Sequence, residues 1–145
     1  MKAVNPYLNF NGNTEEAFTF YRSVFGGDFL AVIRFSDFPG MEGLAADDAG
    51  KLAHIALPLG TGNILMGTDA LESKGHNLTM GTNSYISLEA ESAEEAARLF
   101  DGLSAGGRVE MPLQLTEWAE KYGSCVDRFG VQWMVSYTGS VRFGE

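Results

Sequence analysis

One pattern occurs twice in this sequence, as NTEEAFTFYRSVFGG at residues 13–27 and as SAEEAARLFDGLSAGG at residues 92–107, about 80 positions apart. Each copy opens with a residue type that caps helix N-termini, followed by glutamates that suit the positive end of the helix dipole. Each copy ends in a glycine pair that can adopt the left-handed cap. Apolar residues recur between these signals at helical spacing, so each copy predicts a helix with one buried face.

Strand-like runs surround both helices in the same order. One run precedes each helix and three follow it; the runs are 3–11, 28–37, 52–59 and 63–69 in the first half, and 84–90, 108–115, 122–127 and 131–137 in the second. Each half therefore reads β-α-β-β-β. The sequence predicts an α+β fold in which one domain, residues 1–145, contains two tandem modules at about 1–72 and about 82–140.

The charge and the apolar content restrict the kinds of partner. The formal net charge is −9, which repels phosphate backbones, so nucleic acid and anionic membranes are not expected as partners. No apolar run approaches the roughly 18 to 20 residues of a membrane span, and no signal peptide is expected. Cys125 is the only cysteine, so an internal disulfide cannot form, and we expect a cytoplasmic protein.

Several short motifs spread over the chain resemble one known family. They are Pro6-Tyr7-Leu8-Asn9-Phe10 with Gly12-Asn13, Phe25-Gly26-Gly27, Ala53-His54, Asp69-Ala70, Trp118-Ala119 with Tyr122-Gly123, and Asp127-Arg128-Phe129-Gly130 leading into Val131-Gln132-Trp133-Met134. Together with the duplicated modules, they resemble the PhnB-like branch of the vicinal-oxygen-chelate superfamily, which includes glyoxalases, bleomycin resistance proteins and dioxygenases. The resemblance implies mixed sheets that curve around a cavity, a small-molecule ligand and a homodimer.

The resemblance also implies where a metal ion would bind. Metal-dependent members of the superfamily hold one divalent ion with His and Glu side chains on the first and last strands of each module. Those positions fall here on Pro6, on residues 65–67, on Tyr85 and on Met134, and none offers a usual ligand for Zn, Ni, Mn or Mg. His76 lies in a polar linker, where a solvated role is expected. We therefore predict no metal ion and no other cofactor.

His54 is the first candidate for chemistry. In the run 52–59, Ile55, Leu57 and Leu59 form one apolar face, so alternation places His54 on the other face. A two-residue turn at Thr61-Gly62 would pair His54 with Asp69 across the hairpin. A carboxylate beside an imidazole favours acid-base catalysis near neutral pH. The alternative is a structural His-Asp pair at a sheet edge.

The second module offers candidate ligand-binding residues. Strand alternation places Tyr85, Ser87 and Glu89 on one face of the run 84–90, and Gln132 and Met134 on one face of the run 131–137. Such faces can line a mostly apolar pocket with a few hydrogen-bonding groups, or can simply be solvated. Trp118 can close the rim of such a pocket or lie at an interface. Cys125 is expected to be an inert thiol.

Three functions fit these residues. The first is a metal-independent small-molecule-binding protein, with acid-base catalysis by His54 and Asp69 if it is an enzyme. The second is a glyoxalase-like lyase or isomerase whose metal ligands have moved, for example to His54, Glu89 and Asp69. The third is a resistance-type protein that sequesters a ligand without converting it. Metal content separates the second function from the others, and turnover separates the first from the third.

Overall fold

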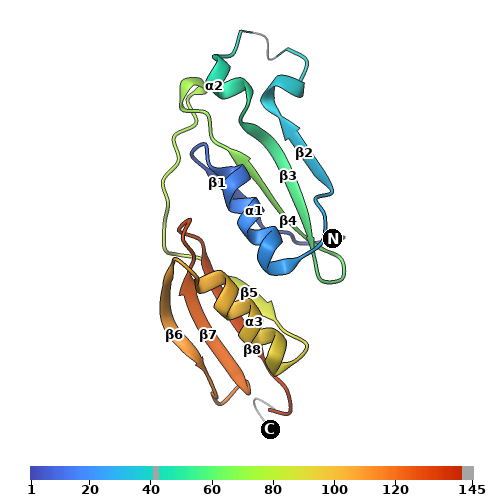
Figure 1. Cartoon of the computed structure of the whole chain (residues 1–145), viewed down its shortest axis with the longest axis vertical. Coiled ribbons are helices and arrows are strands. Elements are labelled where there is room, and N and C mark those ends of the chain that lie inside the picture. The colour runs from blue at the N-terminus through green and yellow to red at the C-terminus, as the bar shows by residue number, and fades with distance from the viewer. Residues whose placement is uncertain (41–42, 142–145) are drawn as a thin grey trace. The chain divides into compact units, whose positions relative to one another are not determined.

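The computed structural model of the chain describes residues 1–40 and 43–141. The chain divides into two compact units, Met1–Thr79 and Met80–Glu145, and each contains one four-stranded sheet with one long helix (Figure 1). The predicted α+β fold of two β-α-β-β-β modules is confirmed.

The first unit contains a mixed sheet with the strand order β1-β4-β3-β2, in which β1 runs parallel to β4 and the other neighbours are antiparallel. Its main elements are β1 (Tyr7–Phe10), α1 (Thr14–Phe25), β2 (Ala31–Arg34), β3 (Leu52–Leu59) and β4 (Asn63–Asp69). Three short helices lie in the connections, η1 (Phe35–Asp37), α2 (Ala46–Ala49) and η2 (Glu72–Lys74). The sequence signals did not predict these short helices.

The second unit repeats this topology with the strand order β5-β8-β7-β6. Its elements are β5 (Ile86–Glu89), α3 (Ala93–Ser104), β6 (Arg108–Gln114), β7 (Lys121–Val126) and β8 (Gln132–Tyr137). Strand β5 is parallel to β8, and the other neighbours are antiparallel. The first strand of each module therefore pairs with the last, a long-range contact that local sequence does not specify.

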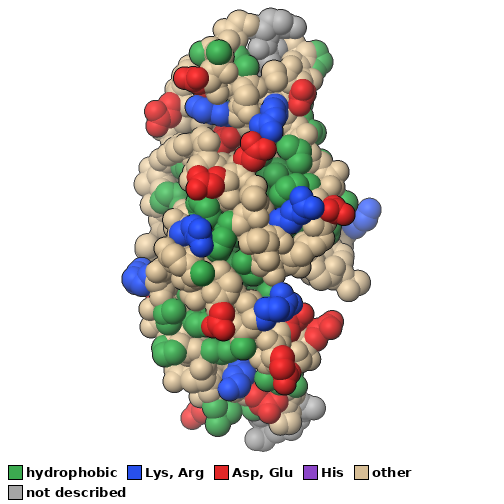
Figure 2. Space-filling model, viewed as in Figure 1, with side chains coloured by type: hydrophobic (Ala, Val, Ile, Leu, Met, Phe, Trp, Pro, Cys, Tyr) green, Lys and Arg blue, Asp and Glu red, His purple; other side chains and the backbone are tan. Residues whose placement is uncertain are grey.

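Each helix packs on one face of its own sheet. Helix α1 buries Ala17, Phe18, Tyr21 and Val24 and packs on β3 and β4, while α3 buries Ala96, Leu99, Phe100 and Leu103 and packs on β7 and β8. Gly67 of β4 allows the closest approach, since a Cβ there would lie 2.6 Å from a ring carbon of Phe18. On the outward faces of α1 and α3, acidic and basic side chains are interspersed (Figure 2). Among the described residues, no helix of the same unit lies on the other face of each sheet. We call this other face the helix-free face.

The turn between β3 and β4 differs from the prediction. Leu59 pairs with Asn63, so the loop has three residues, Gly60 to Gly62, instead of two. Both glycines have positive φ, 54° and 89°, which other residue types rarely adopt. The extra loop residue shifts the hairpin register by one position, and a shift of one moves a side chain to the opposite face of a sheet.

Within the described residues, no helix reaches the length and apolar character that a membrane crossing requires.

Candidate functional site

The face of the first sheet that lies away from α1 carries a tyrosine and a histidine in contact. Tyr7 of β1 pairs with Met66 of β4, and Met66 pairs with Ala56 of β3. His54 lies two residues before Ala56 and therefore shares its face. The Tyr7 hydroxyl lies 3.1 Å from His54 Nδ1, and the two rings are tilted at 33° with centroids 5.8 Å apart. The hydrogen bond crosses β4, which separates the two strands.

The surroundings of Tyr7 keep its hydroxyl protonated. Tyr7 is 45% exposed, yet partial burial raises the pKa of its hydroxyl, and a hydrogen bond with the Thr68 side chain lowers it to a smaller extent. The phenol is therefore protonated at neutral pH. Its oxygen can accept a hydrogen bond from Nδ1–H, or its O–H can donate to a bare Nδ1. Because Tyr7 occupies Nδ1 in either case, the second ring nitrogen, Nε2, is the atom that can meet a ligand.

The predicted pairing of His54 with Asp69 is wrong. The observed register places Asp69 opposite Ala53, on the face that packs against α1, because of the longer turn. Asp69 is 3% exposed, and its carboxylate accepts hydrogen bonds from Thr14 N (3.0 Å), Thr14 Oγ1 (2.6 Å) and Leu52 N (2.8 Å). Asp69 thus caps the start of α1 and anchors β3, and these hydrogen bonds join it to Thr14 and Leu52 instead of to His54.

The second sheet has a matching face away from α3. The register aligns Ser87 with Met134 and Ser124, and aligns Glu89 with Ser136 and Tyr122. Trp133 and Val135 of β8 are fully buried on the opposite side. The sequence predicted that Ser87 shares a face with Glu89, and Gln132 with Met134. The observed alternation agrees with both predictions.

A hydrogen bond spans this second face from edge to edge. Tyr85 precedes β5 at one edge of the sheet, and Glu110 belongs to β6 at the other edge. The Tyr85 hydroxyl donates to Glu110 Oε1 at 2.7 Å, and this bond raises the pKa of Tyr85. Gln132, on the central strand between these edges, is only 7% exposed and donates from Nε2 to the Ser84 carbonyl oxygen at 2.6 Å. This hydrogen bond satisfies the buried Gln132 amide.

Glu89 and Trp118 lie toward the other end of the same face. The Glu89 carboxylate accepts hydrogen bonds from Thr138 N (2.8 Å) and Thr138 Oγ1 (3.0 Å). Trp118 is 45% exposed, and its ring packs edge-on against Tyr122 with centroids 5.3 Å apart. Sequence reasoning did not select Tyr7, Glu110 or Tyr122 for the site, although alternation from Lys121 to Val126 places Tyr122 beside Ser124.

The residues where the fold would hold a metal ion do not fit one. On the helix-free faces, the first-strand residue that pairs with Met66 is Tyr7 instead of the expected Pro6, and the one that pairs with Met134 is Ser87 instead of the expected Tyr85. A phenol or a hydroxyl beside a thioether is not a donor set for a hard or borderline divalent ion. Among residues 1–40 and 43–141, no cluster of three or more His, Cys, Asp or Glu side chains has the geometry of a metal site.

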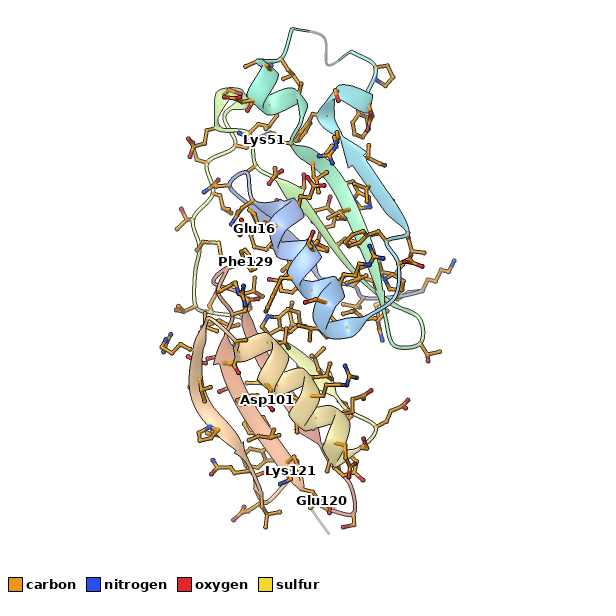
Figure 3. The ribbon with its side chains drawn as sticks, in the orientation of Figure 1. Glu16, Lys51, Asp101, Glu120, Lys121 and Phe129 are labelled. Atoms are coloured by element: carbon orange, nitrogen blue, oxygen red, sulfur yellow. The ribbon has the colours of Figure 1, made fainter. Side chains whose placement is uncertain are left out.

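Two buried groups near the β7–β8 turn have structural roles. Cys125 is fully buried, which raises the pKa of its thiol to about 11, so the thiol is protonated and unreactive at neutral pH. Asp127 accepts hydrogen bonds from Phe129 N (2.8 Å), Val131 N (3.1 Å) and Trp133 Nε1 (2.8 Å). Phe129 lies in this turn (Figure 3), and Gly130 takes the positive φ that the turn requires.

Comparisons with known proteins agree with this architecture. The family model described as Glyoxalase/Bleomycin resistance protein/Dioxygenase superfamily matches residues 3–135. The chain is 32% identical over 145 residues to Protein YjdN of Escherichia coli (strain K12), with 92% of this chain and 93% of that protein covered.

Solved structures give the same result. Protein PA1353 from Pseudomonas aeruginosa is 40% identical, with a TM-score of 0.81 and coverage of 92% of this chain and 96% of that one. A PhnB protein from Bacillus cereus, described as a putative 3-demethylubiquinone-9 3-methyltransferase, is 27% identical, with a TM-score of 0.73 and coverage of 92% and 98%. The match to a PhnB protein agrees with the branch that the sequence motifs resemble.

Proposed function

We propose that this chain, which belongs to the glyoxalase/bleomycin resistance protein/dioxygenase superfamily, binds a small molecule and exchanges a proton with it at His54, without a bound metal ion. The observation that carries this proposal is the hydrogen bond of 3.1 Å between Tyr7 and His54 Nδ1 on the helix-free face of the first sheet. Asp69, which the sequence suggested as the partner of His54, has no part in it.

The chemistry follows from the two nitrogens of the imidazole. When the ring is protonated, Nδ1–H donates to the Tyr7 oxygen, and Nε2–H can give its proton to a ligand oxygen or nitrogen. The neutral ring that results retains its proton on Nδ1, and Nε2 can take a proton back. Because burial raises the pKa of Tyr7, the phenol orients the ring and does not lose its own proton. His54 thus acts as acid or base, and Tyr7 is a positioning residue.

The proposal of a metal-independent site rests on donor chemistry. Tyr7 pairs with Met66, and Ser87 with Met134, on the first and last strands where the resemblance places metal ligands, and neither pair provides a carboxylate or an imidazole. These side chains instead supply the mixture of apolar surface and single hydrogen-bonding groups that is typical of small-molecule sites.

We extend the ligand-binding role to the helix-free face of the second sheet. Its proposed ligand-binding residues are Tyr85, Ser87, Glu89, Trp118, Gln132 and Met134, and Tyr122 and Glu110 join them through their contacts with Trp118 and Tyr85. A homodimer and a cytoplasmic location also belong to this proposal. Support for the dimer comes from the exposed apolar side chains of both outer strands, Leu30 and Val32 around β2 and Val109 and Met111 of β6.

The methyl-transfer activity named for the Bacillus cereus PhnB protein is not part of the proposal. Sites for nucleotide-type cofactors commonly use a glycine-rich loop that follows a strand and opens a helix. Between β1 and α1 this chain has only Gly12, and the segment between β5 and α3 has no glycine.

The proposal is tested by a small-molecule screen in the presence of a metal chelator, read as the thermal shift of the full chain. We expect binders whose stabilisation is lost in His54→Gln and reduced in Tyr7→Phe, while both variants melt within a few degrees of the parent. His76→Gln is the matched control, because His76 is exposed and follows η2. Binding that survives His54→Gln unchanged, or that requires an added divalent ion, would contradict the proposal. Turnover of a binder distinguishes an enzyme from a sequestering protein.

A further inference from the structure

One end of the helix-free face of the second sheet brings together a carboxylate and two aromatic rings. Glu89, Ser136 and Tyr122 are aligned across β5, β8 and β7. Neighbouring strands lie about 4.8 Å apart, so the Cα atoms of Glu89 and Tyr122 are about 10 Å apart, with the small Ser136 between them. Trp118 extends this arrangement through its edge-on contact with the Tyr122 ring. We call these four residues the Glu89 cluster.

The charge of Glu89 is held in place by uncharged donors in the part of the chain that the structure describes. Both of its hydrogen-bond donors, the backbone N–H and the hydroxyl of Thr138, are uncharged. Among the residues that the structure describes, no Lys, Arg or His lies within ion-pair distance of Glu89. Glu110, at the other end of the face, differs because it accepts from Tyr85 and has the Arg108 guanidinium 4.0 Å away.

The aromatic part of the Glu89 cluster is presented to solvent on an anchored segment. Ala119, next to Trp118, is fully buried, and its carbonyl oxygen accepts a hydrogen bond from Thr116 N at 3.0 Å. Trp118 itself is 45% exposed. An exposed indole and a phenol ring near a carboxylate that is fixed by uncharged donors offer a cation both the negative faces of the rings and a full negative charge.

We propose that the Glu89 cluster binds the ammonium group of an organic cation. A metal cation would require three or more oxygen or nitrogen donors at one point, whereas this cluster provides one carboxylate, two hydroxyls and an indole. An alkylated ammonium does not require several donors at one point, because its weakly hydrated surface packs against aromatic rings. The inference rests on the proposed ligand-binding role of this face and gives it a chemical class, but it does not depend on His54 or Tyr7.

Choline and 3,3-dimethyl-1-butanol are suitable probes, because they share a shape and differ in that only choline carries a charge. Each is titrated into the full chain labelled with nitrogen-15, and the two tryptophan indole N–H signals are followed by NMR. We expect choline to shift the Trp118 signal in a saturable way. The Trp133 signal serves as an internal control, since this buried indole donates to Asp127 Oδ2 at 2.8 Å. We expect 3,3-dimethyl-1-butanol to bind about tenfold more weakly than choline, because it lacks the positive charge that the aromatic rings and the carboxylate attract.

Two variants that each remove one negative charge distinguish binding at this site from the general attraction of a cation to an acidic protein. Glu89→Gln should weaken choline binding about tenfold, whereas Glu94→Gln, at an exposed position of α3 outside the proposed ligand-binding face, should change it less than twofold. Equal weakening by both variants would overturn the inference, as would a Trp118 signal that choline does not move. Equal binding of both probes would also overturn it, although that result would leave the proposed ligand-binding role of the face intact.

Discussion

At the scale of single residues, two buried aspartates show how a carboxylate can serve the fold. Asp69 accepts three hydrogen bonds from α1 and β3. Asp127 accepts two from the backbone N–H groups of Phe129 and Val131 and one from the indole of Trp133. Each lies in a motif that also resembles the family. Their hydrogen bonds show how a motif residue can serve the fold without facing a ligand.

The role of Asp69 is testable by replacement with asparagine. Asn offers one acceptor oxygen in place of two, and its NH₂ group faces a donor, so we expect Asp69→Asn to lower the free energy of unfolding by about 3 kcal/mol. Urea denaturation measures this loss. Asp47→Asn, at an exposed position of α2, is the control and should stay within about 0.5 kcal/mol of the parent. A loss for Asp69→Asn no larger than that of the control would show that Asp69 does not hold α1 in place.

At the scale of elements, the two long helices start with different caps although their sequences match. In α3, Ser92 Oγ caps the helix by accepting from Glu95 N at 3.0 Å, and Glu95 Oε1 accepts from the N–H of Glu91, the residue before the cap, at 2.9 Å. In α1, Asn13 makes no side-chain cap, because Asp69 of β4 supplies the acceptor for Thr14 N. The start of α1 is therefore stabilised from the sheet, and the start of α3 from its own sequence.

This difference predicts unequal effects of removing the two N-cap side chains. Ser92→Ala should lower the free energy of unfolding by about 1 kcal/mol, which is typical for the loss of a serine cap. Asn13→Ala should cost clearly less, because Asn13 makes no capping hydrogen bond that would be lost. Chemical denaturation of the two variants side by side is the measurement. A larger loss for Asn13→Ala than for Ser92→Ala would contradict this account of the two helix starts.

Local signals predicted most elements but not their long-range partners. The bounds of β3 and β4 were predicted to the residue, helped by Gly60 after β3 and Gly62 before β4. The run 3–11 is a strand only at Tyr7–Phe10, since an edge strand extends only where its neighbour offers hydrogen bonds.

The sequence Gly60-Thr61-Gly62 fits loops of two or three residues, so the register and the partner of His54 could not be decided locally. Tyr7 reaches His54 only through parallel pairing of β1 with β4, which no nearby sequence signal reveals.

At the scale of the whole molecule, we expect a homodimer. The edge strands β2 and β6 carry exposed apolar residues, with Val32 43% and Val109 46% exposed. Pro112 within β6 disfavours simple edge-to-edge extension of that sheet, so we expect contacts through side chains. Size-exclusion chromatography with light scattering at micromolar concentration should give twice the chain mass of 15.7 kDa. A single species of 15.7 kDa would contradict the dimer.

The most direct test of the central claim follows the two histidines by NMR during ligand binding. The full chain, labelled with nitrogen-15 in its histidine rings and treated with a chelator, is screened against a library of small polar molecules. We predict binders that shift the ring nitrogens of His54, with Nε2 affected most, while the exposed His76 stays unchanged as the internal control. Binders that leave the His54 signals in place, or a response of His54 that appears only when Zn²⁺, Ni²⁺ or Mn²⁺ is added, would contradict a metal-independent site at Tyr7 and His54.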